Sequence, residues 1–397
     1  MRPRRFAMVV AAALVPSAAV ACLWDSDTIK MERSRFPTTL ELITGKFLRH
    51  SPEFYEWRIR DRLKKLESNP NDPRLLDDLA VAYDKTGQHD KAIETMERQE
   101  KHNPGRYETA ANLGTFYFHS GKLDAGIPHI DRALAINPDA HFGREKYQNL
   151  LVQYVIERRE GGPLNLPLTR LEFPGEKKLD DAGRYDFTTH DTFADFLKKG
   201  GPQSLPREER EAAVKGILGM MKFGKHDSPV LLEALGSVLV DEGHDGPHDA
   251  KLLAARAYLK ASYEVPDGPA RRAYRLLADY ALMMQTRARD SQEQIKLEPV
   301  EAEFQKELAE ARDWYADLRE RELSWIRDGK DPEAEFDKLY DSEPEVSGMD
   351  AKDTMSAETW DYIHLGALGA GVILALVAVA VLGYRAYRRW AGRGASV

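Results

Sequence analysis

The feature that most constrains this chain is a pattern that recurs at a fixed spacing between Pro73 and Ala140. Each residue of the first copy has a counterpart 34 positions further on, and the small, aromatic and proline positions all keep this register. A fixed period of this length is typical of a repeat array. The pairs are Leu79/Leu113, Ala80/Gly114, Tyr83/Tyr117, Gly87/Gly121, Ala92/Gly126, Met96/Ile130 and Pro104/Pro138.

The spacing within one copy predicts two helices joined by a turn. Leu79 and Tyr83 lie four residues apart and therefore share one face of a first helix. Ala92 and Met96 share a face of a second helix in the same way. Gly87 stands between them where the chain must turn, and a proline ends each second helix.

A helix–turn–helix unit of this length and composition resembles the tetratricopeptide repeat. Gln99 departs from the family pattern, which prefers alanine there, and Gly126 replaces another alanine. Residues 228–266 resemble a degenerate third copy with a longer inner loop, in which Gly236 and Tyr258 occupy repeat positions. The resemblance implies an all-α fold, a tetratricopeptide-like helical-hairpin solenoid that binds proteins and catalyses no reaction.

Flanking composition predicts how the rest of the body is divided. Ordered structure is expected to begin near Phe36. The helix over 54–66 is expected to be a cap, because it carries Arg58 and Arg62 where a repeat would carry small or apolar residues. We expect residues 22–72 to form an N-terminal helical cap, 73–159 the repeat array with a capping helix, 160–206 an irregular linker, 207–330 a second helical, repeat-like region and 331–362 an acidic juxtamembrane stalk.

The N-terminal end, residues 1–21, has the pattern of an export signal peptide. Arginines precede an apolar run of about ten residues, and Ala19 and Ala21 form a small-x-small cleavage site. Cys22 follows this site directly, which leaves lipidation of the mature N-terminus open.

The C-terminal end predicts a membrane anchor. Residues 363–384 are predicted to form a transmembrane helix: Leu365–Gly383 carries no charged or amide side chain, is flanked by aromatic side chains, and at about 1.5 Å per residue is long enough to cross a bilayer. The basic tail, residues 385–397, is expected in the cytoplasm by the positive-inside rule, which places the body on the extracytoplasmic side. Gly366 and Ala370 would also permit a homodimer through this helix.

Charge and cysteine content exclude several function classes. The net charge is −8, and arginines at both ends leave the body between them still more acidic, which argues against a nucleic-acid partner. A single cysteine excludes intramolecular disulfides and multi-cysteine metal sites.

Two clusters of polar residues have the residue types of a catalytic or metal site. One is the loop with His244 and His248, and the other is Asp180–Asp181 with His190 and Asp191 nearby. Neither carries a phosphate loop, an HExxH pair or a nucleophile elbow. We therefore predict no catalytic, cofactor or metal site, with an envelope hydrolase or metal-dependent enzyme built on helical repeats as the alternative.

The repeat resemblance places a partner-binding groove on the first helices. Asn112 matches the subgroup that binds C-terminal carboxylates, but Asp77 stands where that subgroup needs a lysine, so an extended or basic segment with an apolar anchor near Phe118 is the expected ligand. The candidate groove residues are Asp77, Val81, Asp84, Asn112, Thr115, Phe118 and His119. The sequence thus predicts a membrane-anchored adaptor that binds protein partners outside a bacterial-type membrane.

Overall fold

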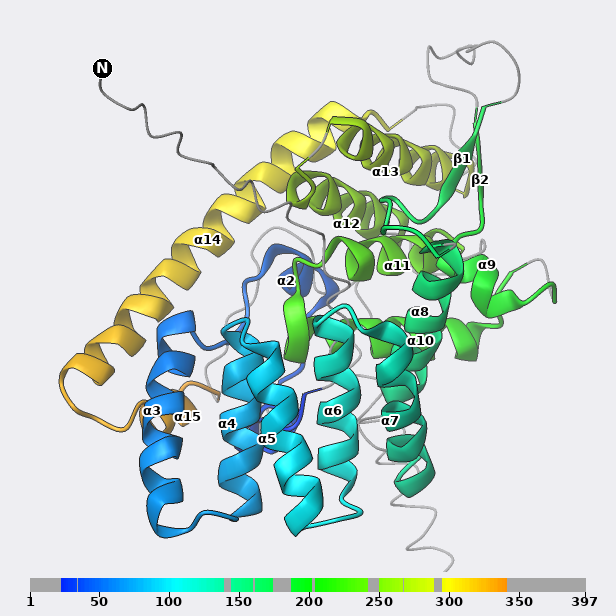
Figure 1. The fold of residues 1–397 in the computed structure, drawn as a ribbon. Helices are drawn as coiled ribbons and strands as arrows, with labels where there is room; N and C mark the ends of the chain where they lie inside the picture. The colour runs from blue at the N-terminus through cyan, green and yellow to red at the C-terminus, as the bar shows by residue number, and fades with distance from the viewer. Residues whose placement is uncertain are drawn as a thin grey trace, which may run out of the picture. The chain divides into compact units, whose positions relative to one another are not determined.

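The computed structural model describes residues 23–33, 35–138, 144–159, 161–173, 187–201, 204–241, 250–266, 268–288 and 295–340. All of them belong to one compact unit, Met1–Ser347, and nearly all elements in these ranges are helices (Figure 1). The helices are α1 (Ser26–Arg33), α2 (Thr39–Thr44), α3 (Pro52–Ser68), α4 (Pro73–Lys85), α5 (His89–His102), α6 (Tyr107–His119), α7 (Leu123–Ile136), α8 (Arg144–Arg159), α9 (Phe193–Lys198), α10 (Arg207–Met220), the π-helix η2 (Met221–Lys225), α11 (Pro229–Val240), α12 (Ala250–Glu264), α13 (Gly268–Ala288), α14 (Leu297–Arg327) and α15 (Pro332–Asp337).

The two clear repeats form the helical hairpins α4–α5 and α6–α7, as the spacing predicts. Asp72 caps α4 by accepting hydrogen bonds from the backbone N–H groups of Arg74 and Leu75. Gly87 turns the chain between α4 and α5 with a φ of 75°, a conformation that favours glycine. The small residue at position 114 is equally necessary for the close packing of α6 on α7. A Cβ atom on Gly114 would lie 2.5 Å from the side chain of Ile130.

The degenerate third copy forms the hairpin α11–α12. Gly236 of α11 lies against the ring of Tyr258 of α12, at the same repeat position that Gly114 occupies in the second copy. A Cβ atom on Gly236 would lie 2.7 Å from Tyr258 Cζ. The same rule of close approach therefore operates in the second helical region.

The capping helix α8 also contacts the region that follows it. Leu151 of α8 is buried, and Tyr147 packs against Gly216 of α10. Helix α8 therefore continues the helical packing into the second region and does not end it.

Residues 160–206 are more regular than an irregular linker. The strands β1 (Arg170–Glu172) and β2 (Thr188–His190) form an antiparallel pair in which Leu171 lies opposite Thr189. Helix α9 follows with a capping box at Thr192 and buries Phe193. A short β-hairpin is thus present in a fold that the sequence predicts as all-α.

The ordered N-terminus begins before Phe36, and this corrects the predicted start of the fold. Leu23 is 3% exposed, and Asp25, Asp27 and Thr28 are buried as well. The cap helix α3 likewise buries a face that includes Arg58 and Arg62, while Leu63, which its apolar pattern would place inside, is exposed. Both arginines are buried because they pair with acids: Arg58 pairs with Asp25 and Asp27 of the N-terminal residues, and Arg62 pairs with Asp78 of α4.

Helix α14 is the longest element and connects distant parts of the fold. It runs along one side of the body from α12 and α13 to α2 and α3 (Figure 1). Helix α15 then packs Phe336 against Leu48 and Leu318, so residues 332–337 belong to the folded body and the predicted stalk does not begin at residue 331.

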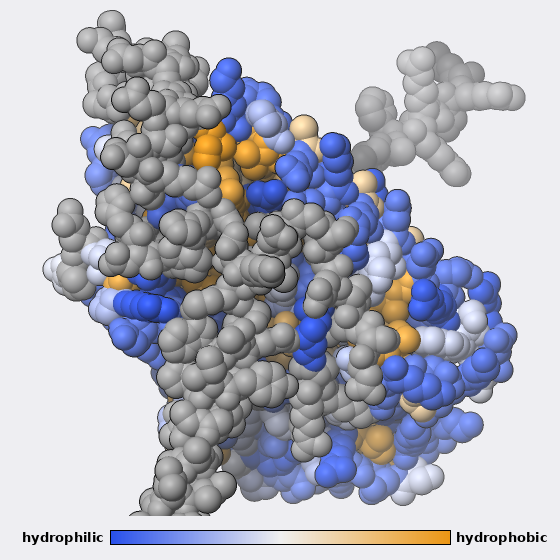
Figure 2. All heavy atoms as spheres, turned by 180° about the vertical axis from the view of Figure 1, so that it is seen from behind, coloured by the Kyte–Doolittle hydropathy of each residue, from blue (hydrophilic) through white to orange (hydrophobic). Residues whose placement is uncertain are grey.

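The predicted signal peptide, stalk remainder, membrane helix and tail lie outside the described residues. Within those residues, every helix is too short or too polar to cross a membrane. The described surface in Figure 2 is mainly hydrophilic with separate hydrophobic patches, and few large apolar side chains, among them Leu63, Ile136 and Phe173, are exposed.

Candidate functional site

The candidate site is built around the N-terminal segment, residues Leu23–Thr28, which lies against α4 and α6. The backbone N–H of Trp24 donates to Asn112 Oδ1 at 2.8 Å, and Asn112 Nδ2 donates to the carbonyl of Trp24 at 2.9 Å. The N–H of Ser26 donates to Asp78 Oδ1 at 2.8 Å. The side-chain amide of Asn112 therefore binds both backbone polar groups of the residue at position 24. This contact does not depend on the side chain at that position.

The apolar side chains of this segment add a second kind of contact. Leu23 joins the hydrophobic cluster of the first repeat with Leu76 and Val81. The ring of Trp24 meets Tyr107 of α6 edge to face, with centroids 6.1 Å apart. The inner face of the repeats is thus occupied by the chain's own N-terminal residues.

The acidic side chains of the segment pair with Arg58 of α3. Arg58 Nη1 lies 3.0 Å from Asp25 Oδ2, Nη2 contacts Asp27, and Nε donates to Glu333 Oε1 of the distant α15 at 2.8 Å. Burial and the neighbouring charge of Asp27 raise the pKa of Asp25 to about 6. Burial opposes ionisation of Asp27 as well, but Arg58 and His50 outweigh it and hold the pKa of Asp27 well below its usual range.

His50 connects the same acids to α14. Its Nδ1 lies 2.6 Å from Glu322 Oε1 and its Nε2 lies 3.3 Å from Asp27 Oδ2, while its ring stacks on Phe54 at 3.6 Å. Burial alone would lower the pKa of His50, but the carboxylates of Asp27 and Glu322 raise it to about 9. His50 is therefore a buried cation between two acids at neutral pH.

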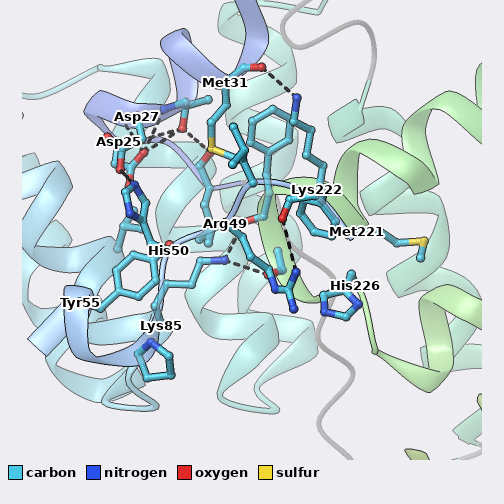
Figure 3. Close-up of a pocket in the computed structure, with 18 of the residues that line it drawn as sticks. Asp25, Asp27, Met31, Arg49, His50, Tyr55, Lys85, Met221, Lys222 and His226 are labelled. Atoms are coloured by element: carbon cyan, nitrogen blue, oxygen red, sulfur yellow. Dashed lines mark hydrogen bonds and ion pairs between the residues drawn. The ribbon is translucent and has the colours of Figure 1, made fainter. Parts of the chain in front are cut away.

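A cavity of about 200 Å³ lies beside this segment (Figure 3). Its charged lining includes Arg49, Lys85, Lys222 and His226, and its apolar lining includes Phe47 and Met221. The π-helix η2 contributes to the wall, and single π-helical turns frequently occur at functional sites.

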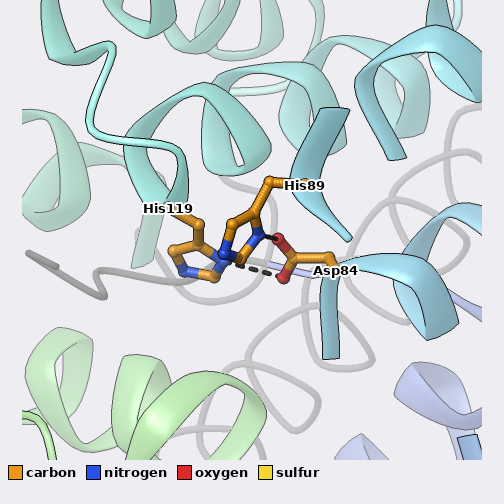
Figure 4. Close-up of side chains that lie close together, drawn as sticks. All are labelled: Asp84, His89 and His119. Atoms are coloured by element: carbon orange, nitrogen blue, oxygen red, sulfur yellow. Dashed lines mark hydrogen bonds and ion pairs between the residues drawn. The ribbon is translucent and has the colours of Figure 1, made fainter. Parts of the chain in front are cut away.

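A second cluster joins the two repeats at their turns (Figure 4). Asp84 Oδ1 lies 2.7 Å from His89 Nδ1, and Asp84 Oδ2 lies 2.7 Å from His119 Nδ1. One donor atom from each residue lies within 4.8 Å of the others, and zinc accepts such a set of two imidazoles and a carboxylate. Both nitrogen–oxygen distances are those of hydrogen bonds, so the geometry described here is a crosslink between α4, α5 and α6.

Six of the seven predicted groove residues are buried, His119 is partly buried, and all seven contact other parts of the protein. Asp77 binds Gln99 and Arg106, and Thr115 accepts from Gln148 at 3.0 Å. Phe118 fills the space at Gly126 of α7, Val81 is in the hydrophobic cluster, and Asn112 binds the N-terminal segment. Asp84 and His119 form the cluster of Figure 4. Their role in binding a partner stays a prediction, and as described they form no open surface.

The structure describes only part of the two polar clusters that were considered as catalytic or metal sites. His244, His248, Asp180 and Asp181 lie outside the described residues. His190 is half-exposed on β2 and pairs with Thr188 and Glu172, whereas Asp191 pairs with Arg158. The described part of that cluster is therefore an arrangement of ordinary surface pairs.

Sequence reasoning missed the residues that gather at the cavity and at His50. Arg49 and His50 lie between α2 and α3, Lys85 ends α4, and His226 follows η2. The adjacent Lys222, Lys225 and His226 were the one available signal, since three basic residues within five positions interrupt an otherwise apolar stretch.

Comparison with known proteins agrees with the geometry of the hairpins. Residues 73–104 match the family described as tetratricopeptide repeat. A further match is to the small glutamine-rich tetratricopeptide repeat-containing protein 2 of Mycosarcoma maydis, which is 29% identical over 75 residues, 19% of this chain and 21% of that protein. The chain thus contains a tetratricopeptide repeat, and such repeats indicate a module for protein–protein interaction.

The shared part is limited to the repeats. The chain spans about a fifth of the length of the curated relative that it matches. The activity, partners and location of that whole protein therefore do not carry over to this chain.

Proposed function

We propose that this protein is a membrane-anchored adaptor that binds protein partners on the extracytoplasmic side of a bacterial-type membrane. The export signal over 1–21 and the apolar segment over 363–384 support the anchoring and the orientation. The repeat match over 73–104 supports a protein partner. The absence of an enzymatic activity stays a prediction.

The observation that carries the proposal is the backbone contact at Asn112. Because Asn112 binds both the N–H and the carbonyl of Trp24, the face of α4 and α6 binds the non-helical residues just before α1 through their backbone. The segment that occupies it is acidic, with Asp25 and Asp27 on Arg58. We therefore propose that a partner presents an apolar residue followed by acids and replaces the N-terminal segment, a revision of the basic ligand that the sequence suggested.

Capture from an envelope extract tests the partner part of the proposal. The full chain in detergent is compared with Asn112→Ala and with a variant that lacks residues 23–28, and circular dichroism checks that each is folded. We expect Asn112→Ala to lose a protein that the wild type retains and the deletion to retain more of it. Asn103→Ala is the matched control, because Asn103 makes only a long, exposed contact to the carbonyl of Asn71. Equal capture by all four proteins would contradict the proposal.

Protease protection tests the anchoring. A protease added outside intact cells whose outer envelope has been removed should digest the body and spare an epitope on residues 385–397. Extraction of the whole chain by alkaline carbonate, or digestion of the tail from outside, would contradict the proposed orientation. Crosslinking of Gly366→Cys variants in membranes tests the proposed homodimer contact separately.

A further inference from the structure

The cavity beside the N-terminal segment collects positive charge that the described part of the protein does not neutralise. Its volume of about 200 Å³ is far above the roughly 10–15 Å³ that a single water molecule requires. Arg49 and Lys85 bring positive charge to it from separate parts of the fold, and the ring of His226 lies on the same lining (Figure 3). Like charges that converge in a partly enclosed space repel one another unless an anion lies between them.

Arg49 is the clearest case. Its Nη1 donates to the backbone carbonyls of Gly45 and Phe47, and its guanidinium stacks on Tyr315 with 3.6 Å to the ring centroid. None of the carboxylates in the described ranges pairs with it, and its Nε and Nη2 have no acceptor there. A guanidinium held rigidly with two free donors is the side chain that best matches a carboxylate or a phosphate.

Lys85 is held at the same cavity by backbone oxygens. Its Nζ donates to the carbonyls of Phe223 and Gly224 at 2.8 Å each, both in η2. Those two bonds use two of its three protons, and within the described residues no acid pairs with its charge. The π-helical turn thereby fixes an ammonium group while leaving one donor available.

His226 completes the group. Its Nδ1 is buried and has no hydrogen-bond partner in the described structure. The ring of His226 and the guanidinium of Arg49 both lie next to Gly45. A Cβ atom added to Gly45 would lie 2.7 Å from His226 Cε1 and 3.4 Å from Arg49 Nη2. Burial, followed by the charges of Arg49 and nearby lysines, lowers the pKa of His226 well below its usual range.

The acids on the other side of the cavity are already engaged. Asp25 and Asp27 line it as well, but both pair with Arg58, and Asp27 also pairs with His50. Burial lowers the pKa of both Arg49 and Lys85, and it outweighs the carboxylate of Asp227, which acts on both cations, and those of Asp84 and Asp25, which act on Lys85. An anion from outside the described chain would compensate these cations further.

We propose that this cavity binds a small molecule through its anionic group, a carboxylate or a phosphate that is held between Arg49, Lys85 and His226. The apolar part of the ligand would lie against Phe47, Met221 and Phe223 on the same lining. This inference does not depend on the proposed adaptor role, because Arg49, Lys85 and His226 take no part in the backbone contact at Asn112, although residues of the N-terminal segment line the same cavity.

Calorimetric titration of the full chain in detergent with inorganic phosphate and with acetate, at constant ionic strength, tests the proposal. We expect saturable binding of at least one of the two probes and a loss of affinity of about tenfold or more in Arg49→Gln, because charge-assisted hydrogen bonds are lost. Arg319→Gln is the matched control, since Arg319 is an exposed arginine of α14 that pairs with Glu53 outside the cavity.

Each outcome decides the question. Binding of phosphate alone or of acetate alone supports the site and identifies the anion. No saturable binding of either probe to the wild type, or the same affinity in Arg49→Gln as in the wild type, overturns the proposal. If Arg49→Gln does not fold, Lys85→Met replaces it. The ring nitrogen resonances of His226 in the wild type must shift when the probe binds, and an unchanged spectrum also overturns the proposal.

Discussion

At the scale of single residues, Asn112 decides whether the N-terminal segment stays in place. Asn112→Ala removes both hydrogen bonds to the backbone of Trp24. We expect a loss of about 1–3 kcal/mol in the free energy of unfolding, because two backbone groups lose their partners. Urea denaturation measures the loss, and hydrogen exchange at the Trp24 amide should accelerate far more than exchange in α5.

The control for this prediction is Asn103→Ala. The contact of Asn103 with the carbonyl of Asn71 is exposed and 3.4 Å long, so its removal should change the free energy of unfolding by less than about 0.5 kcal/mol. Similar losses in the two variants would show that the segment contributes nothing through Asn112.

His50 predicts a loss of stability at alkaline pH. Its pKa rises from 6.5 to about 9 on folding, so its contribution is complete below about pH 6.5 and disappears as the pH rises through 9. This shift corresponds to on the order of 3 kcal/mol. The pKa values of buried Asp25 and Asp77 are raised to about 6 and about 7, so these two acids change the stability at lower pH than His50 does.

The measurement is the unfolding free energy of the wild type and of His50→Gln between pH 6 and pH 10. The variant should be less stable near pH 6, and the difference should shrink steadily towards pH 9, since the neutral imidazole no longer attracts Asp27 and Glu322. A difference that is independent of pH would refute the assigned charge of His50.

At the scale of helices, close approach at the small repeat positions determines the stability of the hairpins. Gly236→Ala would place a Cβ atom 2.7 Å from the ring of Tyr258, and a ring between two packed helices cannot yield freely. We expect a loss of about 1–3 kcal/mol in thermal or urea unfolding, although alanine is the better helix former by about 0.5–1 kcal/mol.

A glycine without such a neighbour is the control for close packing. Gly162→Ala places its Cβ 3.5 Å from the carbonyl of Arg159, an ordinary contact, and should leave stability nearly unchanged. If Gly236→Ala stabilised the protein, this result would contradict the close packing of α11 on α12.

The helical hairpins were predictable because their signal is local. The spacing of Leu79, Tyr83 and Gly87 follows from helix geometry, and every contact that it implies lies within one repeat period. The N-terminal segment has no such signal, since Leu23–Thr28 has neither helical nor strand periodicity. Its place depends on Arg58 and Asn112, which local patterns cannot connect to it.

The cavity was unpredictable for the same reason. Arg49, Lys85 and His226 stand in three different elements, and each has an ordinary sequence context for an exposed basic residue. Only the packing of η2 against α4, through the bonds of Lys85 to two carbonyls, brings them together.

At the scale of the whole molecule, α14 joins the N-terminal helices α2 and α3 to the second helical region. Its Glu307 forms a two-point pair with Arg256 of α12, at 2.9 and 3.0 Å, and both side chains are buried. Near its other end, Glu322 binds His50 and the backbone N–H of Ser51. One helix therefore takes part in the buried polar contacts of both regions.

This arrangement predicts cooperative unfolding of the described body. Glu307→Ala leaves Arg256 buried without its partner and should cost about 3–5 kcal/mol, whereas the double variant Arg256→Met, Glu307→Leu should cost much less. Circular dichroism and tryptophan fluorescence should report one coincident transition in urea. Two separate transitions would mean that α14 does not couple the regions.

The contacts of Arg58 also impose an order of events on a chain that is made from its N-terminus. Arg58 pairs with Asp25, which precedes it, and with Glu333, which follows it by 275 positions. While the chain is still emerging, the hairpins α4–α5 and α6–α7 can assemble from neighbouring residues, but the acid of α15 does not yet exist. Arg58 can therefore pair with Asp25 and Asp27 early, but its buried charge cluster is complete only when Glu333 arrives near the end of the described chain.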